Sequence, residues 1–415
     1  MSKRRVAITG IGLLTPLGSD KQEIWDSLCQ GKSGVERIQK FDPSDFPSQI
    51  AGEIRDFDPG RFMSRKEASR LDLFAQYGIV ASGLAVEDAG LDLDAVDPDR
   101  IGVIIGSGIG GIVVFEEQYK RVLNRGYQKC SAFFIPKMMM NAVSGNISIH
   151  YGVRGPNYAV ASACASASHA LGLAFRTIQY GDADVVLTGG TEAAVTPLGL
   201  AGFCAMKALS TRNDEPHRAS RPFDLERDGF ITGEGSGVLV FEDLDHARAR
   251  GARLYAEVAG FGTTGDAYHI TAPDPEASGA ARSMTLAMKD AGCGPEDVDY
   301  INAHGTSTPF NDPMEVKAIK KAFGEQRARQ IPVSSTKSMM GHMLGAAGAA
   351  ELGVTAISVH DDRAHPTLNL ENPDPLCDLD FIPGEVRDIP MNVALSNSFG
   401  FGGHNACIVL RKIQN

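Results

Sequence analysis

The 415-residue chain lacks the cysteine and metal-ligand patterns that mark several specialised protein classes. Its cysteines are spread singly, with no Cys-x-x-Cys pair: Cys29, Cys130, Cys164, Cys204, Cys293, Cys377 and Cys407. This spacing excludes a disulfide framework, a zinc ribbon and an iron–sulfur site, and it favours a reducing compartment. The sequence has no His-Glu-x-x-His motif and no third ligand at a diagnostic spacing, so we expect no metal site.

An excess of positive charge and a long apolar run are also missing. The chain has 40 Lys and Arg residues against 51 Asp and Glu residues. The net charge of −11 has the wrong sign for binding nucleic-acid phosphates or an anionic membrane. The longest uncharged stretch, Gly155–Phe175, contains Pro156 and His169, and glycines and Pro16 interrupt the signal-like run Val6–Ser19. We therefore expect a cytoplasmic protein with no membrane segment and no nucleic-acid partner.

Short apolar runs alternate with amphipathic stretches along the whole chain, as is typical of an α/β protein with buried sheets. The expected strands are Arg5–Ile11, Arg100–Gly106, Asn157–Val160, Asp184–Gly189, Gly237–Phe241, Tyr255–Gly260, Tyr300–Asn302 and Asn392–Leu395. The expected helices include Arg70–Ala89, Ala165–Tyr180 and Gly279–Ala291. We expect the last strand to lead directly into a glycine-rich loop, Ser396–Asn405.

An internal repeat is the clearest sign of domain organisation. The segment Ala85–Leu91 is echoed 202 residues later by Ala287–Cys293, and Val6–Gly12 resembles Glu257–Gly262. At roughly 150 residues per domain the length alone suggests about three domains. The ordered repeat instead indicates two fused copies of one α/β unit. We place them at residues 1–250, which hold Cys164, and residues 251–415.

Cys164 lies between a predicted strand and an Ala/Leu-rich helix pattern, among small residues. A thiol at such a turn meets the free amides and partial positive charge of the helix N-terminus. This arrangement lowers a thiol pKa and favours the nucleophilic thiolate. Cysteine is also among the most buried residue types, so the local pattern alone leaves a structural role equally open.

Two histidines of the second half lie in glycine- and threonine-rich turns. His304 follows the predicted strand Tyr300–Asn302, and His342 precedes a Gly/Ala-rich helix, Leu344–Glu351. Loops at strand ends face the cleft of an α/β fold, although a lone histidine is more often structural. The glycines of Phe399–Gly403 allow backbone amides to face an anion. Another glycine-rich run, Gly106–Gly111, lacks the residues of a phosphate loop, and we interpret it as close backbone packing.

Together these residues resemble the β-ketoacyl-[acyl-carrier-protein] synthase family of condensing enzymes, in the thiolase-fold superfamily. The resemblance is nearest to the type II elongating synthases of fatty acid synthesis, and it covers essentially the whole chain. The motifs that carry it are Val6–Gly12, Ala161–Ser168, Asp224–Gly235, Asn302–Thr306, Lys337–His342 and Phe399–Gly403. The family fold consists of two related βαβαβαββ halves in a five-layer αβαβα core, which accounts for the internal repeat.

The resemblance implies a fatty-acyl-elongating decarboxylative Claisen condensation. Cys164 resembles the nucleophile that takes the acyl chain as a thioester. His304 and His342 resemble the pair that supports decarboxylation of malonyl-carrier protein, by donating Nε2–H bonds to the thioester oxygen. Lys337 resembles the active-site lysine, which we expect to organise charge with Glu351.

The resemblance also assigns the surroundings of the nucleophile. The amides of Cys164 and Phe401 are expected to hold the oxyanion, and Phe401 with Phe399 resembles the gate of the acyl site. The residues expected to bind the acyl chain and the pantetheine arm are Ile109, Phe203, Thr271, Thr306, Thr308 and Phe399. The residues expected to contact the acidic acyl carrier protein are Arg65, Lys66, Arg70 and Lys207.

The family implies a homodimer that takes acyl and malonyl thioesters on the 4′-phosphopantetheine arm of acyl carrier protein, with no other cofactor. Alternatives are a polyketide-type ketosynthase, a non-catalytic chain-length partner, and a thiolase or Cys–His hydrolase. The retained Cys164 disfavours a non-catalytic partner, and the two histidines weaken the thiolase reading. The sequence departs from the family at His404, where many relatives have threonine, at Ala272 and around Asn311–Pro313.

Overall fold

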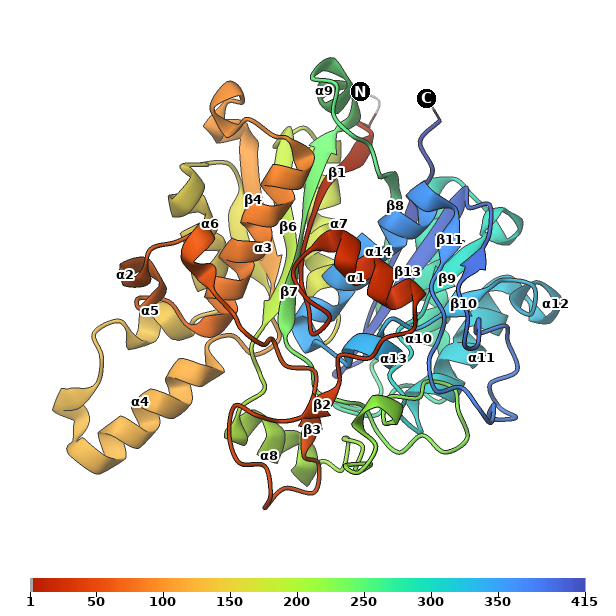
Figure 1. Ribbon diagram of the computed structural model, residues 1–415. Helices are drawn as coiled ribbons and strands as arrows, with labels where there is room; N and C mark the ends of the chain where they lie inside the picture. Colours follow the sequence, from red (N-terminus) through yellow and green to blue (C-terminus); the bar gives the residue numbers. More distant parts are fainter. Residues whose placement is uncertain (1–2, 415) are drawn as a thin grey trace.

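The computed structural model describes residues 3–414, which fold around a ten-stranded sheet (Figure 1). Its first half contains β1 (Val6–Leu14), β4 (Ile101–Gly106), β5 (Asn157–Val160), β6 (Val185–Glu192) and β7 (Gly235–Asp243). Its second half contains β8 (Ala256–Gly265), β9 (Tyr300–Asn302), β10 (Val333–Ser334), β13 (Val393–Gly400) and β14 (His404–Arg411). Two small two-stranded sheets pair β2 (Glu36–Arg37) with β3 (Ile50–Ala51), and β11 (Arg363–Ala364) with β12 (Arg387–Asp388).

The two halves of the large sheet repeat one strand order. The first half runs β5-β4-β6-β7-β1, and the second runs β10-β9-β13-β14-β8. The halves meet where β1 pairs antiparallel with β8, through the short register Val6–Val258 to Ile8–Ala256. The predicted duplication of an α/β unit is thus confirmed. The boundary at residue 250 stays a prediction; it lies between α9 (Leu244–Ala249) and β8.

The helices build the remaining layers. Helices α7 (Ser166–Gln179) and α14 (Ala347–Asp361) pack between the two halves of the sheet, as the centre of Figure 1 shows. Helices α3 (Leu73–Ala89) and α10 (Ser278–Ala291) cover the outer faces of the first and second halves. The other helices are α1 (Lys21–Cys29), α2 (Arg65–Ala68), α4 (Ile112–Arg125), α5 (Phe134–Met138), α6 (Ala142–Tyr151), α8 (Pro197–Ala205), α11 (Asn311–Phe323), α12 (Glu325–Ala328) and α13 (Lys337–Met340). The result is the predicted five-layer thiolase-like fold.

The sequence repeat has a packing cause. A Cβ at Gly12 of β1 would lie 2.0 Å from the carbonyl oxygen of Ala81, and one at Gly262 of β8 would lie 2.0 Å from that of Ser283. Only glycine therefore lets α3 and α10 approach their strands so closely. A backbone–carboxylate hydrogen bond fixes each helix along its strand in the same way in both halves. The Ile11 amide of β1 donates to Asp88 of α3, and the Phe261 amide of β8 donates to Asp290 of α10.

The end of the chain corrects one prediction. Strand β13 continues to Gly400, and β14 begins at His404 and pairs with it, so only residues 401–403 of the predicted loop Ser396–Asn405 lie outside the strands. The residues Ser396–Ser398 are small and polar, which hid the strand. They are nevertheless buried, because α14 covers this part of β13.

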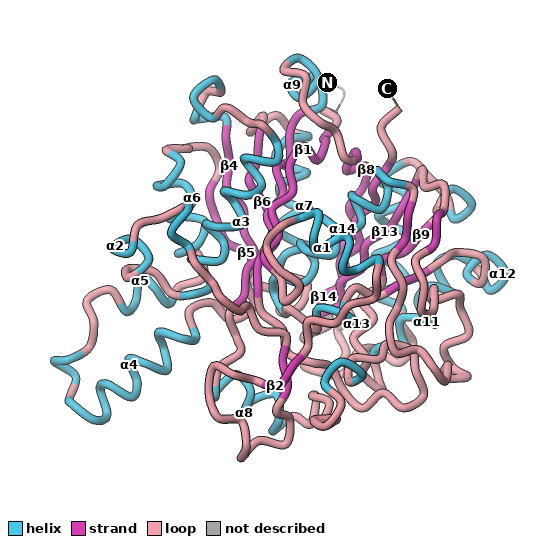
Figure 2. The backbone as a smooth tube through the Cα atoms, in the orientation of Figure 1, coloured by secondary structure: helices cyan, strands magenta, loops and turns pink. Residues whose placement is uncertain are grey.

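Long connections gather at the lower edge of the sheet in the view of Figure 2, where they enclose the site described below. Several of them follow the carboxyl ends of strands, the usual place for a binding site in an α/β sheet. Val6–Ser19, the signal-like run, begins as the buried strand β1. Within residues 3–414, no helix has both the length and the apolar character needed to cross a membrane.

Candidate active site

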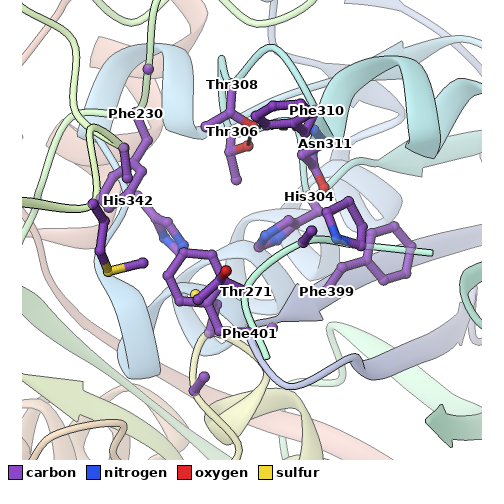
Figure 3. Close-up of a pocket in the computed structure, with 18 of the residues that line it drawn as sticks. Phe230, Thr271, His304, Thr306, Thr308, Phe310, Asn311, His342, Phe399 and Phe401 are labelled. Carbon is purple, nitrogen blue, oxygen red and sulfur yellow. Dashed lines mark hydrogen bonds between the residues drawn. The ribbon is translucent and has the colours of Figure 1, made fainter. Parts of the chain in front are cut away.

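A cavity of about 400 Å³ lies where the two halves meet. It is lined by residues of both halves, as Figure 3 shows. The predicted site residues that line it are Cys164, His304, His342, Phe401, Ile109, Phe203, Thr271, Thr306, Thr308, Phe399 and Lys207. The fold therefore brings together, from segments far apart in sequence, most of the residues that the motifs singled out.

Cys164 lies on a sharp turn between β5 and α7, here called the elbow (Ser162–Cys164). Ala163 has φ +51°, in the left-handed region that alanine rarely adopts. The hydroxyl of Ser166 stabilises this turn by accepting from the Ser162 amide and donating to the Ala163 carbonyl. The strain directs the thiol of Cys164 into the cavity, although the residue is only 8% exposed.

The electrostatics of Cys164 correct the sequence prediction of a lowered pKa. Burial raises the pKa of the Cys164 thiol to about 11, and Glu192 adds to that rise. The Lys337 ammonium and the backbone amides of Phe401 and Cys164 lower the pKa without cancelling the effect of burial. The local amides do lower the thiol pKa, but desolvation by residues distant in sequence raises it further.

Two backbone amides face the thiol from different segments. The amides of Cys164 and Phe401 both act on the sulfur, and Gly400 brings their segments together. A Cβ at Gly400 would lie 2.7 Å from the Ser162 carbonyl oxygen and 3.1 Å from the Cys164 nitrogen. A side chain there would separate the elbow from the glycine loop (Phe399–Gly403). The pair of amides forms a preorganised site for negative charge beside the sulfur.

His304 is held by a buried carboxylate and faces the cavity. The amides of His304 and Gly305 donate to Glu315 over 2.8 and 2.7 Å, and burial raises the pKa of Glu315 to about 7. Nζ of Lys337 lies 3.4 Å from Nδ1 of the His304 ring. Burial, the Lys337 charge and His342 hold the pKa of His304 well below its usual range, so the ring is neutral.

His342 is fixed by its backbone and by an amide next to it. Its N–H donates to the Ile231 carbonyl over 2.7 Å, and its own carbonyl accepts from Gly233 over 2.8 Å. The Leu344 amide donates to Nδ1 of the ring over 3.2 Å. Burial and the Lys337 charge hold the pKa of His342 well below its usual range. Nδ1 of the neutral ring is therefore an acceptor, which leaves the proton on Nε2.

The two rings form one hydrogen-bonding unit. Their centroids are 5.4 Å apart at an interplanar angle of 85°, and Figure 3 shows both pointing into the cavity beside Phe401. A lysine ammonium beside Nδ1 of His304 favours the Nε2–H tautomer there too. The arrangement offers two neutral N–H donors to one oxygen atom of a ligand, close to a cysteine sulfur.

Lys337 does not line the cavity; it acts on the site from behind. Its ammonium group pairs with Glu351 on α14, and both side chains are almost fully buried. The predicted contact between these residues is confirmed. Lys337 is buried although it stands at the start of a helix, because α13 is packed inside the protein.

The apolar part of the cavity includes the residues expected at a gate and an acyl site. Phe399 packs edge-on against His304 at 5.8 Å between ring centroids and is buried, whereas Phe401 is half-buried. Ile109 and Phe203 line another part of the wall. Phe203 packs against Phe230, which in turn lies edge-on to His342.

The threonines form the polar side of the cavity. Oγ1 of Thr306 lies 2.9 Å from Oγ1 of Thr308, and Ser307 between them has φ +69°. This kink turns both hydroxyls to the same side, which Figure 3 shows. Thr271 lies on a different, exposed loop that reaches the cavity from β8.

The glycine-rich run after β4 surrounds a residue that the sequence analysis missed. Glu192 is fully buried and accepts from the amides of Gly108, Ile109 and Gly345 over 2.7, 3.1 and 3.0 Å. The anion held by these amides is thus a side chain of the protein, and the interpretation as close packing is confirmed. Its place at the end of the buried strand β6 indicates a buried carboxylate, but the sequence does not show which amides hold it.

The basic residues expected at a partner surface lie in two places. Lys207 is exposed at the edge of the cavity. Arg65 and Lys66 are exposed on α2, and Arg70 lies over the ring of Phe133 at 5.8 Å; none of the three lines the cavity. In the described part of the chain, no three His, Cys, Asp or Glu side chains are grouped so that they could hold a metal ion.

Comparison with family models matches the chain in two segments. Residues 3–247 match the beta-ketoacyl synthase, N-terminal domain, and residues 255–371 match the beta-ketoacyl synthase, C-terminal domain. The two matches cover most of the chain, and the gap between them contains residue 250.

Curated relatives are similar over their whole length. A 3-oxoacyl-[acyl-carrier-protein] synthase 2 from Coxiella burnetii is 52% identical over 413 residues, which is 100% of both chains. The protein of the same name from Synechocystis is 51% identical over 100% of this chain and 99% of its own, and that from Staphylococcus aureus is 50% identical over 99% of each.

Solved structures have the same fold. A beta-ketoacyl synthase from Burkholderia phymatum superposes with a TM-score of 0.93 at 38% identity, over 99% of this chain and 100% of that one. A type II polyketide ketosynthase, solved with its acyl-carrier protein, superposes with a TM-score of 0.92 at 35% identity over the same shares.

Proposed function

Because the chain belongs to the β-ketoacyl synthase family, we propose that it is a 3-oxoacyl-[acyl-carrier-protein] synthase that elongates fatty acyl chains. It is an acyltransferase. Acyl-carrier protein, malonyl-carrier protein and one proton give 3-oxoacyl-carrier protein, carbon dioxide and free carrier protein. The full-length identity of 50–52% to 3-oxoacyl-[acyl-carrier-protein] synthases favours this reaction over polyketide synthesis, since the type II polyketide ketosynthase is only 35% identical.

In the first step the sulfur of Cys164 attacks the acyl thioester. A C–S bond to Cys164 forms, the C–S bond to the phosphopantetheine arm breaks, and the free thiol of the carrier protein leaves with the cysteine proton. The amides of Cys164 and Phe401 stabilise the negative oxygen of the tetrahedral intermediate. Since burial raises the Cys164 pKa to about 11, the same amides and the Lys337 charge are what make the thiolate accessible.

In the second step malonyl-carrier protein loses carbon dioxide. The C–C bond to the carboxylate breaks, and its electron pair passes into the enolate of the thioester. Nε2–H of His304 and Nε2–H of His342 hydrogen-bond to the thioester oxygen and stabilise this enolate. Neutral donors suit this task, because a cation in the same place would hold the malonyl carboxylate as an ion pair.

In the third step the α-carbon of the enolate attacks the Cys164 thioester. The new C–C bond forms, the C–S bond to Cys164 breaks, and the released Cys164 thiolate takes a proton from solvent. The amides of Cys164 and Phe401 serve again as the oxyanion site. The three steps therefore need one cysteine and two pairs of hydrogen-bond donors. The two backbone amides stabilise the oxyanion of the acyl group, and the two imidazoles stabilise the enolate.

The single observation that carries the proposal is the convergence on one cavity of Cys164 and two neutral imidazoles with Nδ1 occupied. The test is turnover: purified protein, acyl-carrier protein and ¹⁴C-malonyl-carrier protein should release labelled carbon dioxide and form the 3-oxoacyl product. Cys164→Ala should form no product. A wild-type protein that releases no carbon dioxide and forms no product would refute the proposal.

The gate and the acyl site complete the proposal. Phe401 moves aside when an acyl chain enters, with Phe399 beside it, and the chain extends along Ile109 and Phe203. Thr306, Thr308 and Thr271 bond the amides of the pantetheine arm. The supporting observation is that all of these residues line one cavity whose polar side bears the threonines.

The partner is an acidic acyl carrier protein, and the protein works in the cytoplasm with no cofactor beyond the phosphopantetheine arm of that partner. Lys207, at the edge of the cavity, and the exposed Arg65, Lys66 and Arg70 provide local positive charge on an acidic enzyme.

Reversal of the charge in Arg65→Glu/Lys66→Glu should raise KM for carrier-bound substrate and spare turnover of a pantetheine-thioester analogue. Equal loss with both substrates would remove these residues from docking.

The protein acts as a homodimer. β5 is an edge strand of the ten-stranded sheet, and its Tyr158 side chain is 39% exposed. Exposed edges of this kind pair with another chain. Exposed apolar side chains also occur nearby in sequence on α4 and α5, including Phe115, Tyr119 and Ile135. Light scattering should give a mass close to 88 kDa, about twice the 44.2 kDa of the chain, and a monomer would contradict the proposal.

A further inference from the structure

His169 on α7 lies outside the cavity and outside the mechanism above, yet both of its ring nitrogens are used. Nδ1 lies 2.7 Å from Oγ of Ser162 in the elbow, and Nε2 lies 2.7 Å from Oγ1 of Thr263 on β8. The first contact joins the helix to the turn that bears Cys164. The second joins the same ring to the other half of the protein.

The ring is a neutral bridge. Burial and His404 lower the pKa of His169 to about 4, so one ring nitrogen donates and the other accepts. Phe261 on β8 packs edge-on against the ring, at 6.2 Å between centroids and 87°. The titratable group on the remaining side is His404, whose ring is 6.4 Å away, also at 87°. Hydrogen bonds and edge packing together fix the plane of the His169 ring.

His169 also connects to the glycine loop through two contacts. The carbonyl oxygen of Ser162 lies directly against Gly400, where a Cβ would be 2.7 Å away. The His404 ring folds back over Gly402, where a Cβ would lie 3.1 Å from Cδ2 and Nε2 of that ring. The Ser162 contact and the His404 contact place His169 between the elbow and the glycine loop. Those two segments supply the two amides that face the sulfur.

We propose that His169 is a positioning residue that holds the elbow and the glycine loop at the separation at which the amides of Cys164 and Phe401 both reach one oxyanion. This inference rests on the proposed function. It assigns no chemical step to His169; the residue acts through Ser162 and the strained turn at Ala163. Three contacts hold the His169 ring in this position: the hydrogen bonds to Ser162 and Thr263, and the edge contact with His404.

The test compares His169→Leu, His169→Asn and Thr263→Val with the wild type. The leucine variant loses both hydrogen bonds, and we expect kcat to fall about 100-fold, as for a reacting group misplaced by about 1 Å, with KM for acyl-carrier protein within about twofold. Asparagine keeps a polar atom near Ser162 and should recover kcat to within about tenfold of the wild type. Thr263→Val should lie between the two. His360→Leu, at an exposed histidine on α14, is the matched control.

A second readout separates positioning from mere folding. The pH profile of Cys164 alkylation by iodoacetamide should move to higher pH in His169→Leu, because the two amides no longer stabilise the thiolate together. His360→Leu should leave the profile in place. If the leucine variant does not fold, the asparagine and Thr263→Val variants carry the same comparison.

The outcomes are distinct. A folded His169→Leu variant with wild-type kcat and an unmoved alkylation profile overturns the inference while leaving the proposed function intact. Equal kcat losses in the leucine and asparagine variants also overturn it, because the Ser162 hydrogen bond would then contribute nothing. A wild-type protein without turnover refutes the proposed function itself.

Discussion

The ammonium group of Lys337 lies 3.4 Å from Nδ1 of His304. Its charge is balanced by Glu351 behind it, so it can orient the imidazole without protonating it. We expect Lys337→Met to free the His304 ring from its Nε2–H tautomer and to reduce malonyl decarboxylation about 100-fold. Acylation of Cys164 should slow by less, because the amides of Cys164 and Phe401 still lower the pKa of the thiol. Carbon dioxide release and intact-protein mass measure the two steps separately.

Stability provides the control for this variant. Lys337→Met leaves Glu351 buried without a partner, which should lower the free energy of unfolding by about 3 kcal/mol. The double variant Lys337→Met/Glu351→Leu should regain most of that stability and still fail to decarboxylate malonyl-carrier protein. Recovery of decarboxylation in the double variant would show that the lysine serves the fold alone.

Substitution of His304 or His342 should affect decarboxylation, whereas substitution of Cys164 should abolish acylation. His304→Ala should keep acylation of Cys164 near the wild-type rate and reduce carbon dioxide release about 100- to 1,000-fold, the usual effect of removing one oxyanion donor. The assay is mass spectrometry of the acylated protein followed by trapping of labelled carbon dioxide. Equal decarboxylation rates in mutant and wild type would remove His304 from the mechanism.

The decarboxylation step should not depend on imidazole titration near neutral pH. Burial and Lys337 hold the pKa of both histidines well below 6.5, so both remain neutral donors as the pH falls from 8 to 6. We expect the rate of carbon dioxide release to be flat over that interval. A fall with a midpoint near 6.5 would mean that at least one ring has the pKa of an exposed histidine.

Stability should respond to acid through the buried histidine His365. Burial lowers the pKa of His365 to about 4, from an ordinary value near 6.5. Between these values the unfolded chain binds a proton that the folded protein excludes, so stability is lost as the pH falls from 6.5 to 4. The loss from this group is about 3 kcal/mol. In His365→Gln, denaturant unfolding should show a smaller decline over this interval; an unchanged decline would contradict the lowered pKa.

The acyl-chain preference should follow the wall of the cavity. Ile109→Ala enlarges the site beside Phe203, and we expect the ratio of kcat/KM for a 16-carbon over an 8-carbon acyl donor to rise about tenfold. Ile149→Ala removes a similar side chain that is 80% exposed and does not line the cavity, and it serves as the control. An unaltered ratio in Ile109→Ala would place the acyl chain elsewhere.

Much of the fold could be predicted from the sequence, because buried strands and close helix–strand contacts require particular residue types. β9 has the predicted bounds, Tyr300–Asn302, and β1, β4, β6, β7 and β8 begin within two residues of their predicted starts. Buried strands have continuous apolar runs, and Gly12 and Gly262 record the close approach of a helix. The sequence does not predict β14, although its interior is buried, because the glycine-rich segment before it has the composition of a long loop.

The site was only partly readable. Cys164, His304 and His342 stand in motifs at strand ends, and the fold brings them to one cavity. The high pKa of the thiol was not predictable, because it comes from burial by residues distant in sequence. Glu192, Leu344 and His169 act through backbone amides or through partners nearly 100 residues or more away, and no local pattern marks such contacts.

The central claim is that Cys164 carries the growing chain between the two carrier-protein substrates. Its most direct test is the intact-protein mass after incubation with acyl-carrier protein and again after addition of malonyl-carrier protein. We predict a mass increase of one acyl group per chain on Cys164, followed by its loss with an equal amount of 3-oxoacyl product. No mass increase in the wild type, or an increase that persists in Cys164→Ala, would contradict the account.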